Sequence, residues 1–421
     1  MKLGHDLVAG ATLNVNGFSG PIVRASGKAM ASGDYLSGDV VHFTRNNGQW
    51  TLGGGGFGTS SGSGTGDPAV IPVTVLTGTI VKTVGGTNPD FADLNAAFTY
   101  ASSVRIPFGS SLTFQIRAGK FTYASSVKFS HPDGARIFVL GATLTNAVPA
   151  PSAMPFTGSS ASQRAADTAS AFTTLRASYA TELYFTGGTQ FFIAGDLGNL
   201  QDLLLSSDGT GSNVSLISIV GGAQNFTRIS IVGAQSTGLV ALNFYTYLNG
   251  ICHLFGCGLL GLSASNNGNV ILRVGSQLGA SSNSYAGLQV SGGAVFGSDN
   301  GGPGGPITYA RGNGSYGVDC NGAIAVFTNG SQFLSNGYAS IFCSNPGYVN
   351  ASSCTLSGGT FGVYALFICY VNVDTANVAA GNTAFRADNM ALIYRVNSTA
   401  STPTPASPAV GSVGNNNAYI I

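Results

Sequence analysis

The chain has 421 residues, a formal charge of +1 and only 8% charged residues, against roughly 25% for an ordinary soluble domain. It lacks a run of Lys or Arg, which argues against nucleic-acid binding because that activity needs a basic surface. With 44% hydrophobic residues and 62 glycines, the composition is typical of a long, turn-rich β structure with a neutral, hydroxyl- and amide-rich surface that suits a glycan.

Residues 1–52 are expected to form a small β module. The segment 40–52 alternates apolar and polar residues around Asn47-Gly48, a dipeptide that tolerates the positive φ angles of a hairpin turn. The first residues run into a polar segment without an apolar stretch, so no secretory signal is expected. Residues 53–68 are rich in Gly, Ser and Thr and predict a flexible linker.

Residues 69–143 predict the start of a repeating β structure closed by a helix. Asp90 is placed to cap that helix, and Asp93 falls in its first turn. Strands are expected at 112–116 and 136–140. Residues 144–186 are expected to be an insertion, with a Pro-broken loop at 148–155 and an Ala-rich helix near 162–179 docked on the side of the repeat.

Residues 187–398 carry a repeat of roughly 22 residues that predicts a parallel β-solenoid, in which each coil covers the apolar face of the next. An aromatic residue or Thr before a small residue recurs from Tyr316 to Thr383, and an apolar residue or Thr before Asn recurs from Thr328 to Val396. Residues 399–421 are expected to form a tail. The copies are Tyr316-Gly317, Tyr338-Ala339, Phe361-Gly362 and Thr383-Ala384; Thr328-Asn329, Val349-Asn350, Val371-Asn372 and Val396-Asn397; and, more weakly, Thr237-Gly238-Leu239, Cys257-Gly258-Leu259 and Ala286-Gly287-Leu288.

Two features of the repeat half have competing interpretations. The run 239–262 is long enough to span a membrane, but its Asn, His and Gly residues favour two buried solenoid coils. The six cysteines form no CxxC pair or zinc-like cluster, so no metal site is expected. They are interpreted as buried thiols in small core positions, with disulfides formed outside the cell as the alternative.

Four segments in order resemble a family, the bacteriophage tail fibres and tailspikes built on a pectate-lyase-like right-handed parallel β-helix. They are Asn47-Gly48-Gln49-Trp50 in the N-terminal module, the linker, the helix start at 90–94, and the stretch from His131 to Ala142. The resemblance implies an all-β homotrimer located in the virion, docked to other virion proteins through residues 1–52, which presents its β-helix to host surface polysaccharide. It implies no cofactor, no nucleic acid and no membrane insertion.

Glycan-cleaving spikes of this kind usually carry paired carboxylates, and the supply here is small. Glu182 is the only glutamate, and several aspartates fall in turns for backbone reasons. If the chain is an enzyme, its candidate acids are Glu182, Asp196, Asp202, Asp299 and Asp319.

The Gly-rich stretch 298–316 is the expected place for a ligand, because long loops on a stacked scaffold usually carry binding surfaces. Asp299, Tyr309, Arg311 and Tyr316 are the candidate glycan-binding residues, with ordinary loop packing as the alternative. His253 lies in the most apolar stretch and is expected to be a hydrogen-bonded core histidine.

The sequence thus predicts a non-enzymatic phage adhesion fibre that binds bacterial surface glycan. Two alternatives remain, a capsule or lipopolysaccharide depolymerase and a structural collar or head fibre without receptor binding.

Overall fold

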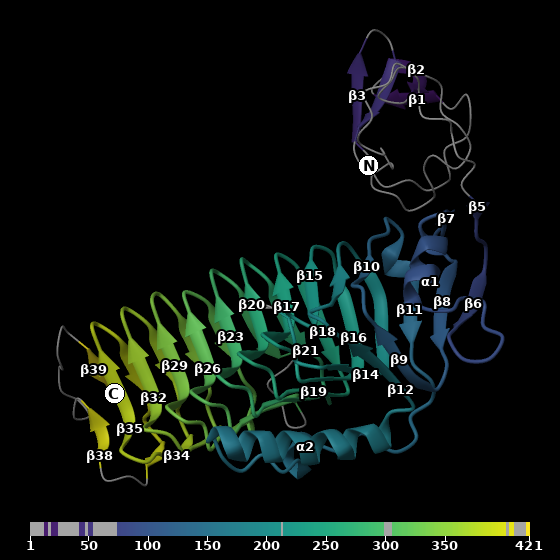
Figure 1. The fold of residues 1–421 in the computed structure, drawn as a ribbon. Helices are drawn as coiled ribbons and strands as arrows, with labels where there is room; N and C mark the ends of the chain where they lie inside the picture. Colours follow the sequence, from purple (N-terminus) through teal and green to yellow (C-terminus); the bar gives the residue numbers. More distant parts are fainter. Residues whose placement is uncertain are drawn as a thin grey trace.

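The computed structural model describes residues 12–15, 18–23, 42–46, 49–53, 74–211, 214–298, 305–400, 404–407 and 418–421. From residue 74 onward the described chain is an elongated parallel β-solenoid, as the repeat predicts (Figure 1).

Each regular coil contributes one strand to a sheet that we call sheet I and two strands to a sheet that we call sheet II. In the described residues sheet I has 11 strands and sheet II has 22. Sheet I contains β10 (Val127–Phe129), β13 (Phe191–Ile193), β15 (Ile217–Val220), β17 (Thr237–Leu242), β20 (Leu260–Ser265), β23 (Ala286–Ser291), β26 (Tyr316–Asn321), β29 (Ala339–Ser344), β32 (Phe361–Leu366), β35 (Thr383–Asp388) and β38 (Thr404–Ser407).

Sheet II carries the remaining strands of the solenoid, which also pair in parallel with the neighbouring coils. They are β6 (Thr79–Val84), β8 (Ser111–Ile116), β9 (Gly119–Tyr123), β11 (Ile137–Leu140), β12 (Thr181–Phe185), β14 (Leu197–Ser207), β16 (Gln224–Val232), β18 (Tyr245–Asn249), β19 (Ile251–Phe255), β21 (Asn269–Leu272), β22 (Gln277–Ser281), β24 (Val295–Ser298), β25 (Ile307–Arg311), β27 (Ile324–Val326), β28 (Gln332–Leu334), β30 (Tyr348–Asn350), β31 (Thr355–Ser357), β33 (Tyr370–Asn372), β34 (Asn377–Ala379), β36 (Leu392–Tyr394), β37 (Thr399–Ala400) and β39 (Tyr419–Ile420).

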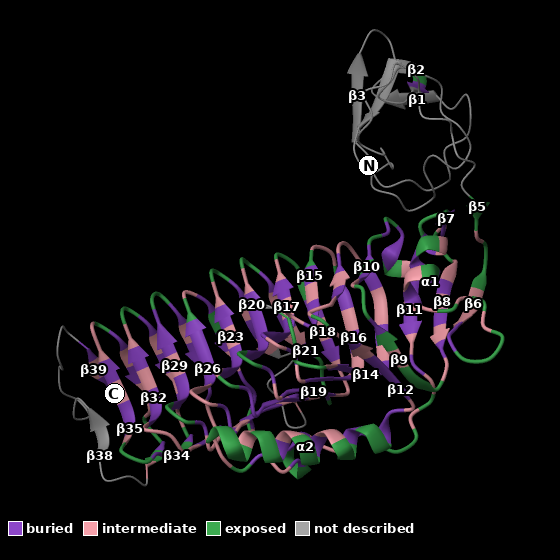
Figure 2. Cartoon of the chain, in the orientation of Figure 1, coloured by how far each residue is buried: buried purple, intermediate pink, exposed green. Residues whose placement is uncertain are grey.

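Apolar side chains that alternate along the strands stack into one continuous core. Buried residues recur from coil to coil along the solenoid (Figure 2). Val349, Val371 and Ile393 illustrate the principle, since they pair in register on successive coils and are fully buried. All six cysteines are buried free thiols, as the first interpretation of the sequence predicts. Stacking identical apolar positions removes both faces of every inner coil from water, which is why the solenoid needs so few charges.

The register corrects three details of the sequence-based repeat. Tyr316 pairs with Ala339, so the copy at Tyr338-Ala339 is displaced by one residue. In the second series Val349 and Val371 are in register, but their partners on the outer coils are Ala325 and Ile393. Similarly, Leu260-Gly261-Leu262, and not Cys257-Gly258-Leu259, pairs between 237–239 and 286–288. The number of residues in the corners varies between coils, so a repeat of fixed length does not identify the residues that pair.

The corner that follows each sheet I strand from β15 to β35 begins with a residue in the left-handed region. Eight stacked corners from Gly221 to Asn389 have φ angles between 51° (Asn266) and 95° (Gly221) at this position. Gly and Asn adopt this conformation at low cost, and they fill seven of the eight corners. The residues are Gly221, Asn243, Asn266, Gly292, Gly322, Asn345, Phe367 and Asn389.

Helix α1 (Leu94–Ala101) packs Leu94, Ala97, Phe98 and Ala101 against the first coils, as predicted. Its cap differs from the prediction, because Asp93 accepts the hydrogen bond from the amide of Ala96 at 2.9 Å. Asp90 instead accepts from the amide of Thr83 and from Lys82, and these bonds lower its pKa to about 2. The sequence placed the cap three residues too early.

Helix α2 (Ala161–Ser178) lies along the outside of the solenoid, close to the predicted range (Figure 1). Ser160 caps it by accepting from the amide of Gln163. A second apolar cluster seals the helix and the segment before it against sheet II, with Phe156, Leu175, Leu204 and Phe255 among its members. Two 3₁₀ turns, η1 (Gly134–Arg136) and η2 (Pro151–Ala153), and the short β5–β7 pair (Thr74–Val75, Val104–Arg105) complete the fold of residues 74–211.

In the N-terminal part, β1 (Thr12–Val15), β2 (Phe18–Val23), β3 (His42–Asn46) and β4 (Gln49–Gly53) form one sheet. Strands β3 and β4 are antiparallel, as the hairpin pattern predicts, although Asn47 and Gly48 lie outside the described residues. The apolar run 239–262 forms β17, β18, β19 and β20, which is little more than one coil and not two. Among the described helices none is long and apolar enough to cross a membrane.

Candidate functional site

Two of the candidate acids are bound to arginines. Glu182 on β12 accepts from Arg176 of α2 through both carboxylate oxygens, at 2.8 and 3.0 Å, and from the hydroxyl of Ser206 at 2.6 Å. A general acid must instead present a protonated oxygen to its substrate. Glu182 therefore holds α2 against the solenoid.

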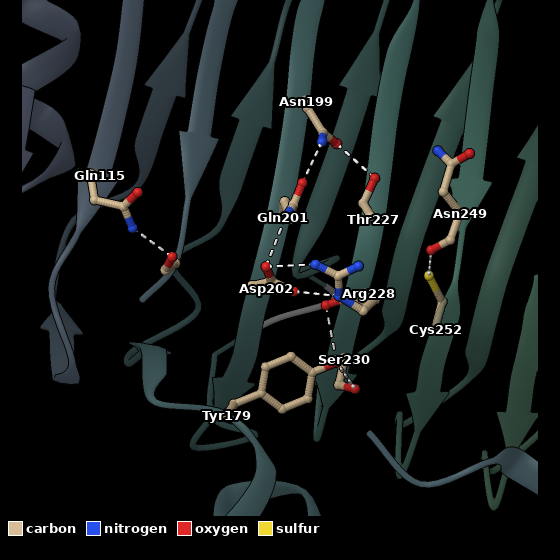
Figure 3. A network of polar contacts seen from close by, with 11 residues as sticks. Gln115, Tyr179, Asn199, Gln201, Asp202, Thr227, Arg228, Ser230, Asn249 and Cys252 are labelled. Carbon is tan, nitrogen blue, oxygen red and sulfur yellow. Dashed lines mark hydrogen bonds and ion pairs between the residues drawn. The ribbon is translucent and has the colours of Figure 1, made fainter. Parts of the chain in front are cut away.

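Asp202 on β14 is held in the same way (Figure 3). Arg228 on β16 donates to its two oxygens at 2.7 and 2.8 Å, and Gln201 donates to it at 2.8 Å. The carbonyl of Arg228 accepts from the hydroxyl of Tyr179, which in turn accepts from Ser230. The network joins two coils to the end of α2, a structural role that leaves neither oxygen of Asp202 for catalysis.

Asp196 also serves the backbone, since it accepts from the amide of Ala223 on the next coil at 2.6 Å. Asp299 lies outside the described residues, as do the other residues of 299–304. Among the described residues no cluster of three or more His, Cys, Asp or Glu side chains could hold a metal ion.

Arg311 on β25 is not a free cation beside a loop. Its guanidinium donates to the carbonyls of Pro151, Ser152, Met154 and Phe156, at 3.0 to 3.3 Å. Tyr309 precedes it by two residues and is only 6% exposed. The insertion covers this part of sheet II and its carbonyls occupy the Arg311 guanidinium, so these two residues offer little surface to a glycan, and their assignment to a glycan site stays a prediction.

His253 lies beneath the same insertion and is fully buried. Its Nε2 contacts the carbonyl of Pro149 at 2.9 Å, and burial lowers its pKa to about 4. A neutral histidine that donates to a carbonyl is the hydrogen-bonded core residue that the sequence predicts.

Tyr316 and Asp319 lie elsewhere, on the outside of sheet I, where a cluster of rings crosses four coils. We call this surface the aromatic face. Tyr316 stacks on Phe342 with ring centroids 4.9 Å apart, and Phe342 contacts Tyr364 at 5.4 Å. Tyr338 is 38% exposed and contacts the rings of both Tyr316 and Tyr364. The aromatic face consists of Tyr285, Tyr316, Tyr338, Phe342, Phe361 and Tyr364.

A ladder of buried asparagines positions three of these rings. Asn283 donates from its side chain to Oδ1 of Asn313 at 3.1 Å, and Asn313 donates to Oδ1 of Asn336 at 2.9 Å. All three are at most 1% exposed. Tyr285, Tyr316 and Tyr338 follow the ladder residues by two or three positions. The hydrogen-bonded asparagine therefore fixes the backbone just before the tyrosine on each of these coils.

Polar groups border the rings on both sides. Asp319 is 4% exposed and accepts from the hydroxyl of Tyr285 at 3.2 Å and from Gln289 at 3.1 Å. Desolvation raises the pKa of Asp319. At the other side the guanidinium of Arg386 lies 5.1 Å from the ring centre of Tyr364 and pairs with Asp388 at 2.8 Å.

This arrangement suits recognition of a sugar better than its cleavage. Rings of Tyr and Phe offer flat apolar surface, and the neighbouring hydroxyl, amide and guanidinium groups offer hydrogen bonds. Asp319 and Asp388 are separated by three strand steps, or about 14 Å at about 4.8 Å a step, beyond the roughly 5–9.5 Å of glycosidase carboxylates.

The sequence reasoning found Tyr316 and Asp319 but gave them separate roles, and it missed the other rings and the asparagine ladder. The signal is an Asn followed closely by Tyr in 283–285, 313–316 and 336–338. It repeats at unequal distances, so a search for a fixed period passes over it.

No family model matches the chain, and no curated protein matches it. Among solved structures it is similar to the A-module of the mannuronan C-5 epimerase AlgE6 from Azotobacter vinelandii, with a TM-score of 0.33 and 10% sequence identity. The match covers 78% of this chain and 94% of that one. At this level the similarity says nothing about activity.

Proposed function

We propose that the chain is a non-enzymatic adhesion protein that binds bacterial surface glycan through the aromatic face. The observation that carries the proposal is the contiguous ring cluster on sheet I with hydrogen-bonding groups at its borders. The partly exposed Tyr338 leaves ring surface available for stacking. At the borders of the cluster, Asp319 accepts from Tyr285 and Arg386 lies against the ring of Tyr364.

We place this binding in a bacteriophage tail fibre or tailspike with a right-handed, pectate-lyase-like helix and three copies of the chain. Support for this part is the resemblance of the four sequence segments to that family. In this setting residues 1–52 dock to other virion proteins, and the binding of many copies multiplies weak single contacts into firm attachment.

The test is titration calorimetry with a panel of purified bacterial capsular and O-antigen polysaccharides. We expect one or more of them to bind, and Tyr338→Ala and Tyr364→Ala each to weaken that binding about tenfold, since burying a ring contributes about 1.5 kcal/mol. Tyr184→Ala is the matched control. The Nζ of Lys120 lies 3.6 Å from the ring centre of Tyr184, but this tyrosine is on sheet II, away from the aromatic face. Unchanged affinity in both aromatic-face variants would contradict the proposal.

The depolymerase alternative is tested on the same samples. Release of new reducing ends from any bound polysaccharide would show cleavage of the glycan and overturn the non-enzymatic assignment. A collar or head fibre would bind virus particles without binding any polysaccharide of the host.

A further inference from the structure

One of the eight stacked corners differs from the others in the residue at its left-handed position. Phe367 occupies the left-handed position that is Gly or Asn in the seven other corners, with φ of 59°. Ile368 follows with φ of 45°, and a β-branched residue in this region is an outlier. On the next coil Met390 also has positive φ, at 64°.

These strained side chains are turned to solvent. Ile368 is 61% exposed, Met390 51% and Phe367 47%. These apolar side chains are exposed and their backbone is strained, so they do not stabilise the single chain by burial in its core. Strain of this kind is retained where the surrounding function requires the side chain.

Beside the corner runs a column of outward apolar residues on sheet II. Ile324, Tyr348, Tyr370 and Leu392 pair in register on four successive coils, and the rings of Tyr348 and Tyr370 stack 5.6 Å apart. Together with Ile368 and Met390 they border a groove of about 590 Å³. We call these six residues the apolar stripe.

We infer that the apolar stripe is the surface through which copies of this chain associate side by side, with their long axes parallel. The inference rests on the proposed assembly of several copies, and it assigns the face that they share. It does not depend on glycan binding.

The absence of charge around the groove favours a second copy of the chain as the partner that binds the apolar stripe. None of the residues that line the groove is charged, so a copy of the same surface meets no repulsion. The outer face of sheet I is a poorer choice, because it carries the partly exposed Arg386–Asp388 ion pair, which would lose its hydration against a copy of the same surface. A sugar is a poorer occupant, because the stripe offers few hydrogen-bonding groups.

Geometry agrees with this choice. The stripe follows one register column, so it runs along the solenoid and not around it. Copies related by rotation about a parallel axis would therefore meet at the same coil, with like residues opposed, in a closed assembly. The aromatic face lies on the other side of the Phe367 corner and stays open to a glycan.

The first experiment measures the mass of the full chain by sedimentation velocity over a range of concentrations. We expect a multimer in the wild type, and Ile368→Asp to raise the dissociation constant about tenfold or more. Val274→Asp is the matched control, since Val274 is 59% exposed on a corner away from the groove. A monomeric wild type, or equal weakening by both variants, would overturn the inference.

Ile368→Asn separates a contact from a folding role. Asn adopts the left-handed conformation of residue 368 at low cost, so the variant should keep or raise the melting temperature of the dilute, dissociated chain while it weakens association. A lower melting temperature with unchanged association would show that Ile368 serves only its own chain and would overturn the inference.

Crosslinking locates the surface independently of stability. All six native cysteines are buried, so Ile368→Cys adds one accessible thiol. A short bis-maleimide should link Ile368→Cys chains into covalent multimers and leave Val274→Cys chains single. Assembly without Ile368→Cys crosslinks would refute this surface while leaving the glycan proposal intact, because calorimetry on the aromatic-face variants tests that separately.

Discussion

The hydroxyl of Tyr285 donates to Oδ2 of Asp319 across 3.2 Å, and this bond joins two successive coils beneath the aromatic face. It connects the ring cluster to the one carboxyl group of that face that is almost completely buried, at 4% exposure. Because this carboxyl group is buried, the stability of the folded chain around the candidate site should depend on pH.

In the wild type, ionisation of Asp319 should destabilise the folded chain as pH rises. Asp319→Asn should remove this effect, because Asn does not ionise. Desolvation raises the folded-state pKa of Asp319 above its usual 3.8, so the folded chain holds this proton more tightly than the unfolded chain does. Its contribution is complete below 3.8 and is lost as pH rises through the folded-state pKa. Melting temperatures of the two proteins should therefore diverge in favour of the variant as pH rises from 3.8 to the folded-state pKa, and the difference should stay constant above it. A constant difference across the range would contradict the buried acid.

Asn313→Ala should destabilise the solenoid by about 3 kcal/mol, because it leaves buried partners of the asparagine ladder unsatisfied. Asn313 accepts from Asn283 and donates to Asn336 and to the carbonyl of Ala280. Denaturant unfolding gives the comparison. Asn350→Ala is the control, since Asn350 bonds only locally to the amide of Ser352 in the described structure, and it should cost less than about 1 kcal/mol. Equal costs would mean that the ladder contributes nothing special.

Asp202→Asn should cost about 1–2 kcal/mol of stability and leave glycan binding unchanged. Asn keeps the left-handed conformation of this residue, with φ of 57°, but loses the charge that Arg228 neutralises. The magnitude is reduced from that of a fully buried pair because the Arg228 side chain is 39% exposed. Unfolding and calorimetry on one preparation decide between this role and a catalytic one. Intact stability with lost activity toward a polysaccharide would restore Asp202 as a candidate acid.

Arg311→Met should loosen the insertion without changing affinity for glycan. Methionine keeps much of the apolar stem but removes the donors that reach four carbonyls between Pro151 and Phe156. Hydrogen exchange followed by mass spectrometry should show faster exchange in 148–160 and unchanged exchange in 361–398. Weakened glycan binding with normal exchange would instead support the original assignment of Arg311 to a sugar site.

The solenoid could be predicted because its cause is local and repeated. Val349 and Val371 recur at a distance set by one coil, and each must cover the next. The site was harder to predict, because Tyr316 and Asp319 acquire their meaning only from Tyr285 and Tyr364 on other coils. The contacts of Arg311 could not be predicted, because the place where the insertion docks is fixed by the apolar cluster around Phe255, which no spacing in the sequence reveals.

The most direct test of the account is a crystal or cryo-electron microscopy structure of the full chain with a polysaccharide fragment that calorimetry has shown to bind. The account predicts sugar density over Tyr316, Tyr338 and Tyr364 on the outside of sheet I, with Asp319 or Arg386 within hydrogen-bonding distance. Ordered sugar elsewhere, such as beside Tyr184 or in the groove that Asn95 and Phe98 of α1 line together with Lys128 of β10, with the aromatic face empty, would contradict it.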